Sequence, residues 1–122
     1  MLKSIFIFGL CILALTSPAQ ADWKQVSRDG GTTYFVNFER IVKTGRNKRE
    51  AWTLVNFKDG TSNVILSEYD CKIGKLRYLQ YGFYDEPFGQ GPRKMWFNTT
   101  SKWVAREPGS PGDQEIQAVC NH

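Results

Sequence analysis

The sequence predicts an α+β domain in which a small antiparallel β-sheet carries a short C-terminal helix tethered by one disulfide. Three observations favour this fold class. Stretches of alternating apolar and polar residues are separated by turns that contain glycine, as in antiparallel sheets. A helix-start signal comes only near the end of the chain. Two cysteines remain after removal of a secretory leader, and one of them lies in that last segment.

The chain begins with the pattern of a secretory signal peptide. Lys3 supplies the positive charge, an apolar run of 11 residues follows, and an A-x-A site ends at Ala21, so cleavage is expected before Asp22. The apolar run is too short to span a bilayer, which takes about 20 residues. We therefore expect residues 1–21 to be a cleaved signal peptide, residues 22–122 to form a single domain, and no membrane span to remain after cleavage. An uncleaved N-terminal anchor is the alternative.

The expected strands follow the leader, each bounded by a turn signal. Every second residue of the segment 32–38 is aromatic or branched, which is the pattern of a half-buried strand. Gly45 divides a basic stretch into the two arms of a hairpin, and Asp59-Gly60 and Ile73-Gly74 mark the next turns. The predicted strands are residues 23–27, 32–38, 40–44, 49–57, 63–71, 75–85 and 94–98, with a loop rich in proline and glycine at residues 85–94.

The tail of the chain predicts a short helix. Ser110 is placed as the N-cap, Pro111 as the first helical residue, and Asp113 three residues after the cap, as in a capping box with Asp in place of Glu. The residues that would face the sheet at helical spacing are Ile116, Val119 and Cys120. A helix of about ten residues is marginal by itself, so its tether to the sheet matters.

The cysteine count predicts that tether. Cys11 leaves with the leader, and Cys71 and Cys120 remain as a pair. Two thiols in a small exported domain are expected to form a disulfide. Closing a loop of about 50 residues stabilises the fold by about 4 kcal/mol in the chain-entropy model. A redox motif needs C-x-x-C spacing and a metal site needs more ligands than the single histidine, His122, so neither a metal nor a cofactor is expected.

A basic stretch is the most suggestive binding feature. The candidate binding residues in it are Arg40, Lys43, Arg46, Lys48 and Arg49. Together they form a patch that could attract heparin-like glycans, lipopolysaccharide phosphates or nucleic acid. The alternative is a solvated hairpin tip that keeps a sheet edge soluble. Without Lys3 the net charge of the chain is only +3, so an acidic partner is permitted but not required, and no specific nucleic-acid partner is expected.

The segment YGFYDEPFG, residues 81–89, is a second candidate binding surface. Most of the 4 Trp, 5 Tyr and 8 Phe of the chain are expected to pack in a thin β core. This segment runs from a strand into a loop and has more rings than one core face can absorb. We therefore expect Tyr84 and Phe88 to be available to a ligand.

The sequence indicates a protein that is not an enzyme, and we expect no catalytic residues. His122 is the last residue, so it is poorly placed as the base for a nucleophile. Asp85 and Glu86 stand beside Pro87, where a solvated turn is favoured over acid–base work. Phosphate-binding, nucleophile-elbow and metalloprotease motifs are absent from the sequence.

Several segments together resemble the surface-adhesin protein E family of Gram-negative bacteria. They are W-x-x-V at residues 23–26, GTTYFVN at residues 31–37, AWTLVNF at residues 51–57, SEYDC at residues 67–71, W-V-x-x-x-P-G-S at residues 103–110, and V-C at residues 119–120. The resemblance covers nearly all of residues 22–120. It implies an antiparallel sheet with a C-terminal helix, a structural disulfide, and an exported, non-enzymatic role; the family is named for adhesins that bind host extracellular proteins.

We therefore expect an exported binding protein whose ligand is a host extracellular protein or an anionic glycan. The alternative is a soluble periplasmic structural or accessory protein without a host ligand. The sequence does not choose between the periplasm and the cell surface or medium. An exposed strand edge would also permit a homodimer.

Overall fold

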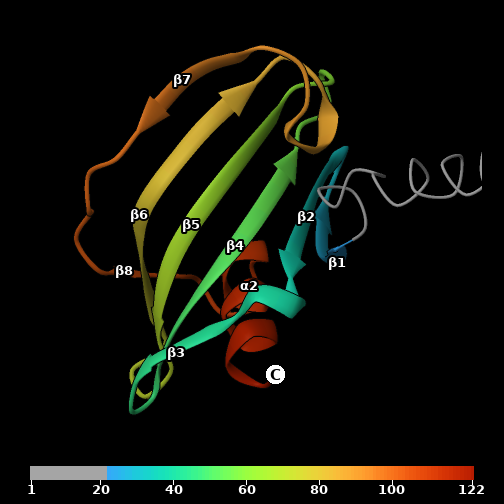
Figure 1. Ribbon diagram of the computed structural model, residues 1–122. Coiled ribbons are helices and arrows are strands. Elements are labelled where there is room, and N and C mark those ends of the chain that lie inside the picture. Colours follow the sequence, from blue (N-terminus) through green and yellow to red (C-terminus); the bar gives the residue numbers. More distant parts are fainter. Residues whose placement is uncertain (1–21) are drawn as a thin grey trace, which may run out of the picture.

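The computed structural model describes residues 22–122, and the predicted signal peptide, residues 1–21, lies outside the described residues. The described chain forms an eight-stranded antiparallel sheet and one α-helix (Figure 1). The elements are β1 (Trp23–Asp29), β2 (Thr32–Asn37), the 3-10 helix η2 (Phe38–Arg40), β3 (Val42–Gly45), β4 (Lys48–Asn56), β5 (Ser62–Asp70), β6 (Lys75–Tyr84), the 3-10 helix η3 (Pro87–Gly89), β7 (Arg93–Phe97), β8 (Val104–Ala105) and α2 (Pro111–Cys120).

Six strands form one continuous path, β1-β2-β4-β5-β6-β7, and the two short strands extend it. β3 pairs with the first part of β4, and β2 pairs with its last part, so these two strands follow one another along the same edge of β4. In the same way β8 pairs with the start of β6 and β7 with its end. The sheet is strongly curved, and α2 lies against one side of it (Figure 1).

The alternation of side chains in β4 defines the two faces of the sheet. Ala51 and Thr53 are buried toward α2, while Trp52 and Leu54 point to the opposite side. We call these sides the covered face and the uncovered face. The core between the sheet and the helix is formed by Val36, Ala51, Tyr69, Leu76, Ile116 and Val119.

The helix and its tether are as predicted. Ser110 caps α2, with its hydroxyl accepting a hydrogen bond from the Asp113 N–H at 3.2 Å. The Asp113 carboxylate accepts from Gly109 N–H at 2.9 Å, one residue before the position that a capping box would use. The disulfide joins Cys71, just after β5, to Cys120, the last residue of α2. It fixes the end of the helix to the turn between β5 and β6.

The predicted strands are present, with one addition. β8 was not expected, because two residues carry no readable alternation; its backbone pairs with Lys75 and Leu76 of β6. The strand expected at residues 94–98 is therefore not the last one. None of the helices in the described part of the chain is long and apolar enough to cross a membrane.

Candidate functional site

Two tryptophans meet on the uncovered face. Trp52 projects from β4, and Trp96 comes from the edge strand β7, although β5 and β6 lie between these strands. Their rings stack with centroids 6.4 Å apart and planes 29° apart. Both side chains are half-buried, so part of each ring remains open to solvent.

The position of Trp96 depends on a glycine near the end of β6. Gly82 pairs with Trp96 across the strands, and a Cβ at Gly82 would lie 2.3 Å from Cε3 of the Trp96 ring and 2.9 Å from the Met95 carbonyl oxygen. Any side chain at residue 82 would therefore displace the ring. The absence of a side chain lets the indole lie close against the sheet and reach Trp52.

These rings line a hollow of about 330 Å³ on the uncovered face. Its other walls include Trp23 of β1, Arg40 of η2 and Tyr84 of β6. β1 and β7 are the two ends of the strand path, so the sheet curls far enough for both ends to contribute to one hollow.

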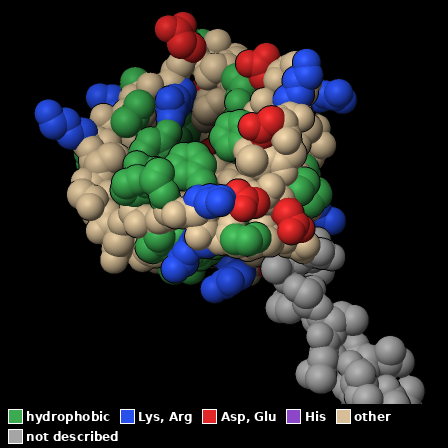
Figure 2. All heavy atoms as spheres, turned by 90° about the horizontal axis from the view of Figure 1, so that it is seen from above, with side chains coloured by type: hydrophobic (Ala, Val, Ile, Leu, Met, Phe, Trp, Pro, Cys, Tyr) green, Lys and Arg blue, Asp and Glu red, His purple; other side chains and the backbone are tan. Residues whose placement is uncertain are grey.

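A second hollow of about 250 Å³ continues from the first. Arg40 and Trp52 line both, and Val42, Glu50 and Leu66 complete the second. We call the combined feature the aromatic groove and define it by Trp23, Arg40, Trp52, Tyr84 and Trp96. In Figure 2, hydrophobic side chains gather in a patch on the surface seen from above, with Lys and Arg side chains at its border.

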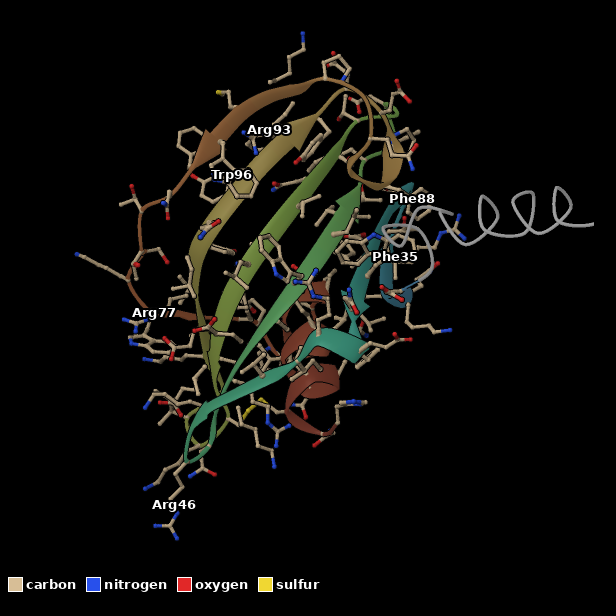
Figure 3. All side chains as sticks on the ribbon, in the orientation of Figure 1. Phe35, Arg46, Arg77, Phe88, Arg93 and Trp96 are labelled. Carbon is tan, nitrogen blue, oxygen red and sulfur yellow. A yellow bond between two sulfur atoms is a disulfide. The ribbon has the colours of Figure 1, made fainter. Side chains whose placement is uncertain are left out.

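Arginines lie at the rim of the aromatic groove. The guanidinium of Arg93 stands over the Trp96 ring, 4.8 Å from its centroid, in cation–π geometry (Figure 3). Arg40 is exposed where the two hollows meet. The groove also contains the acidic residues Asp22 and Glu50, so its charge is mixed rather than uniformly positive.

The segment 81–89, predicted as a binding surface and called the aromatic loop from here on, closes one end of the uncovered face. Phe88 packs against Phe35 with ring centroids 5.3 Å apart, and its N–H donates to Asn56 Oδ1 at 2.8 Å (Figure 3). Ser62 ties the loop down further, since its hydroxyl accepts from the Gly89 N–H at 2.8 Å and donates to the Glu86 carbonyl at 2.6 Å. Phe88 is still 38% exposed, so it is both a packing residue and a surface residue.

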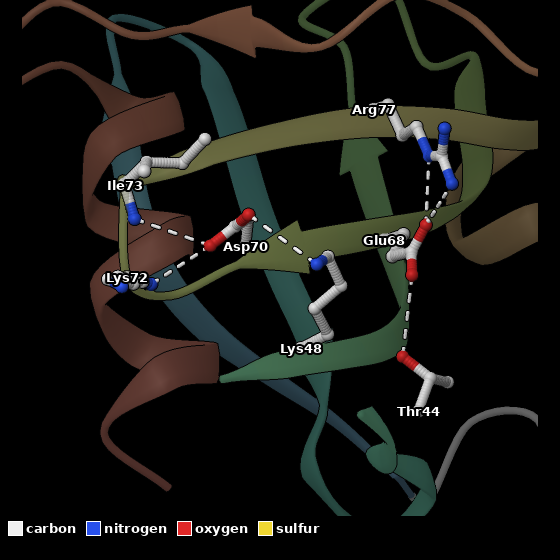
Figure 4. A network of polar contacts seen from close by, with 7 residues as sticks. All are labelled: Thr44, Lys48, Glu68, Asp70, Lys72, Ile73 and Arg77. Carbon is white, nitrogen blue, oxygen red and sulfur yellow. Dashed lines mark hydrogen bonds and ion pairs between the residues drawn. The ribbon is translucent and has the colours of Figure 1, made fainter. Parts of the chain in front are cut away.

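The structure distributes the predicted basic residues over four environments. Arg40 lies in the aromatic groove, and Lys43 and Arg46 are exposed toward the tip of the β3–β4 hairpin. Lys48 forms an ion pair of 3.8 Å with Asp70 (Figure 4). Arg49 points to the covered face, where Nη1 donates to the carbonyls of Val119 and Cys120, both at 2.9 Å, and to that of His122 at 3.2 Å.

The two predicted binding surfaces therefore do not form a single site. The hairpin tip lies before Lys48, whereas the aromatic loop contacts Asn56 at the other end of β4. The nine residues of β4 span about 26 Å at about 3.3 Å per residue. Figure 3 shows Arg46 at the opposite end of the sheet from Phe88. Of the predicted binding residues, Arg40 and Tyr84 line the same hollow.

The covered face holds a buried acid beside another hollow. Glu115 of α2 accepts a hydrogen bond from the Tyr69 hydroxyl at 2.6 Å. Burial raises the pKa of Glu115, while the Tyr69 hydrogen bond and the charge of Arg106 oppose that rise. Burial, and then the charge of Glu115, raises the pKa of Tyr69 well above its usual value. A hollow of about 410 Å³ between α2, β6 and β8 includes Glu115 and Arg106 in its lining.

That hollow is filled in part by its own polar groups. Arg106 donates a hydrogen bond to the Tyr78 hydroxyl, and its guanidinium lies 5.8 Å from the Tyr78 ring centroid. Residues 22–122 contain no group of three or more His, Cys, Asp or Glu side chains placed to hold a metal ion. The aromatic groove is therefore the better candidate for ligand binding.

Sequence reasoning missed the three tryptophans of the groove, Trp23, Trp52 and Trp96. Their strand segments were predicted, but the rings were assigned to packing. One signal was available: Gly82 interrupts a strand rich in aromatic residues, and a glycine inside a strand often marks the close approach of another group. The signal does not say which group approaches, since that depends on how the strands pair.

A family model described as surface-adhesin protein E matches residues 23–121 of the chain. No curated protein sequence matches this chain. Among solved structures, crystal form II of Haemophilus influenzae protein E is similar with a TM-score of 0.68 at 17% identity, over 84% of this chain and 89% of that one.

Two further structures agree with this. A second structure of Haemophilus influenzae protein E has a TM-score of 0.67 at 18% identity, covering 88% of this chain and 91% of that one. The crystal structure of protein E from non-typeable Haemophilus influenzae has a TM-score of 0.65 at 17% identity, covering 84% and 77% of the two chains. At such low identity these likenesses establish a shared fold.

Proposed function

The chain belongs to the surface-adhesin protein E family, and on that premise we propose that it is an exported, non-enzymatic binding protein that holds a protein ligand in the aromatic groove. The observation that carries the proposal is the composition of the groove. Trp, Tyr and Arg dominate the residues that contribute most to protein–protein affinity, and three Trp, one Tyr and one Arg are among the eleven residues that line the two hollows.

The shape of the groove supports an extended ligand. Its two hollows share Arg40 and Trp52, so a ligand segment could run from one into the other past both side chains. The indoles are held by stacking and by the close contact at Gly82. Rings that are fixed before binding lose little conformational entropy when a ligand arrives.

The charges of the groove favour a protein over an anionic glycan. A polyanion is best matched by uniformly positive walls. Here Arg40 stands between Asp22 in one hollow and Glu50 in the other. A protein segment can offer both donors and acceptors to such mixed walls, whereas a uniformly acidic chain would meet two carboxylates.

Substitution of Trp52 tests the proposal. Immobilised extracellular-matrix and serum proteins are screened with the exported protein, and any ligand found is titrated against Trp52→Ala and Arg40→Ala. We expect Trp52→Ala to weaken binding about 30-fold, as for a residue that carries about 2 kcal/mol of binding free energy. The matched control is Arg46→Ala, an arginine of the same basic stretch that lies outside the groove.

Two results would contradict the proposal. One is a ligand whose affinity falls with Arg46→Ala and not with Trp52→Ala. The other concerns location: the protein is digested by protease only after the outer membrane is opened, and not on intact cells. That second result would favour a periplasmic accessory role, and the search for partners would move to envelope proteins.

A further inference from the structure

The proposed function leaves one surface unused, at the end of the sheet away from the aromatic loop. The turn between β3 and β4 and the turn between β5 and β6 lie side by side there, since Cys71 N–H donates to the Asn47 carbonyl at 2.7 Å. The exposed residues that gather at these turns are Lys43, Arg46, Lys72 and Ile73. We call this set the basic tip.

The acid nearest the basic tip is directed inward. One carboxylate oxygen of Asp70 accepts from the N–H groups of Lys72 and Ile73, at 3.0 and 3.3 Å, and the other lies 3.8 Å from Lys48 Nζ (Figure 4). Asp70 thereby shapes the turn and balances Lys48. Within residues 22–122, no carboxylate forms an ion pair with Lys43, Arg46 or Lys72.

An aliphatic side chain stands among these cations. Ile73 is 56% exposed at the apex of the β5–β6 turn, next to Lys72. An exposed isoleucine holds apolar surface in water, which is unfavourable. Entry into the interfacial region of a bilayer would remove that surface from water and so stabilise the bound state. Lysines and arginines around it would then lie at the level of the phosphate headgroups.

We propose that the basic tip docks the protein on an anionic bilayer surface, with Ile73 entering the headgroup region and Lys43, Arg46 and Lys72 facing lipid phosphates. Complementary charge and the exposed isoleucine together favour a lipid surface over a soluble polyanion, which would use the cations and leave the isoleucine in water. Attraction of one Lys or Arg to an anionic membrane changes partitioning about fivefold, so three give a weak, reversible attachment. Docking by this end leaves the length of β4, about 26 Å at about 3.3 Å per residue, between the basic tip and the aromatic loop.

Vesicle sedimentation tests the inference. The exported protein is mixed with vesicles of phosphatidylethanolamine and phosphatidylglycerol, and with vesicles of phosphatidylcholine as the neutral comparison. We expect it to sediment with the anionic vesicles, and we expect salt to release it because exposed charges are screened. The paired substitution Arg46→Glu with Lys72→Glu is expected to weaken partitioning at least about 25-fold, about fivefold for each cation removed.

The matched control makes the same change of charge elsewhere. Lys58→Glu with Lys102→Glu alters two exposed lysines outside the basic tip and should leave most of the partitioning intact. Ile73→Ser should weaken it about fivefold with no change of charge, since the apolar area no longer leaves water. This last variant separates entry into the headgroup region from attraction by charge alone.

Four outcomes would overturn the proposal. The tip variant and the control variant could lose partitioning equally, or Ile73→Ser could have no effect. Inorganic phosphate could release the protein from the vesicles at an ionic strength at which sodium chloride does not release it, which would indicate a site for free phosphate. Retention on heparin without sedimentation on vesicles would indicate an anionic glycan. Because groove variants are not involved, failure here leaves the proposed function standing.

Discussion

The covered and uncovered faces of the sheet are built from the same strands but differ in how far their side chains are buried. On the covered face, α2 buries Ile116 and Val119, and the acid that it brings, Glu115, receives a hydrogen bond from Tyr69. On the uncovered face, Trp52 and Trp96 stay half-buried and Arg40 stays exposed beside them.

The difference shows that residue type alone does not separate packing from recognition. Aromatic residues occur on both faces, and what distinguishes Trp52 and Trp96 is that they stay half-buried and line a hollow. Arginines show the same contrast. Arg49 is occupied by the end of α2, whereas Arg40 projects into a hollow. Four experiments with substituted proteins can break or sharpen this comparison.

The largest effect is expected from removing the tether of the covered face. Cys71→Ser with Cys120→Ser opens a loop whose ends are 49 residues apart, and the chain-entropy model predicts a loss of about 4 kcal/mol in the free energy of unfolding. Urea denaturation followed by far-UV circular dichroism measures it. In water the Trp52–Trp96 signal in near-UV circular dichroism should remain, because the uncovered face does not contain the disulfide. An unchanged denaturation midpoint would contradict the structural role of the bond.

A smaller effect is expected on the uncovered face from Gly82→Ala. The new Cβ would collide with the Trp96 ring and with the Met95 backbone, so the ring must leave the groove at a cost of about 2–3 kcal/mol. The Trp52–Trp96 signal should be lost while the far-UV spectrum is kept. Gly45→Ala is the matched control, since a Cβ there meets only Lys48 Cβ at 3.8 Å. Equal losses in the two variants would mean that the contact at Gly82 does not hold Trp96.

Two arginines of the same basic stretch should differ in their effect on stability. Arg49→Ala removes hydrogen bonds to the last carbonyls of α2 at a partly solvated position, and we expect a loss of about 1 kcal/mol. Arg46→Ala removes an exposed turn residue and should stay within about 0.5 kcal/mol of the unsubstituted protein. Thermal denaturation of the two variants at one pH provides the comparison, and equal midpoints would argue against a capping role for Arg49.

Sequence reasoning succeeded where the signals were local. The Ser110 cap, the hairpin turns and the Cys71–Cys120 pair each follow from a few neighbouring residues or from a count, and the structure confirms them. It could not foresee that Arg40 and Arg49, nine residues apart, would lie on opposite faces. That outcome depends on which side of the sheet the helix packs against and on the 3-10 turn at η2, which shifts the alternation between β2 and β4.

The groove could not be predicted from the sequence either, because it too depends on how distant strands are arranged. Trp52 and Trp96 are 44 residues apart in the sequence and meet only because of the strand order and the curl of the sheet. Alternation predicts the side of a strand on which a side chain lies, but not the strand that will curl over it. Tyr84 was expected to be available to a ligand and lines the groove; its part in binding remains a prediction.

The smallest effect is expected from Glu115→Gln, and its direction depends on pH. Burial raises the pKa of Glu115 above the value of about 4.5 that it has in the unfolded chain, so the folded protein holds this proton more tightly. The contribution of Glu115 to stability is therefore greatest below pH 4.5, and it is lost as the pH rises through the folded-state pKa. An amide has no proton to lose there, and its oxygen can still accept from the Tyr69 hydroxyl at the same place.

We therefore expect Glu115→Gln to be more stable than the unsubstituted protein at neutral pH and to have a flatter dependence of the unfolding midpoint on pH above 4.5. Glu107→Gln is the control, because Glu107 is exposed and loses the same charge without leaving a buried site. Thermal midpoints measured across this range for all three proteins decide the matter. If the thermal midpoints of Glu115→Gln and Glu107→Gln changed with pH in parallel, the hydrogen bond from Tyr69 and the charge of Arg106 would offset the burial of the Glu115 carboxylate. The ionised Glu115 would then not destabilise the covered face.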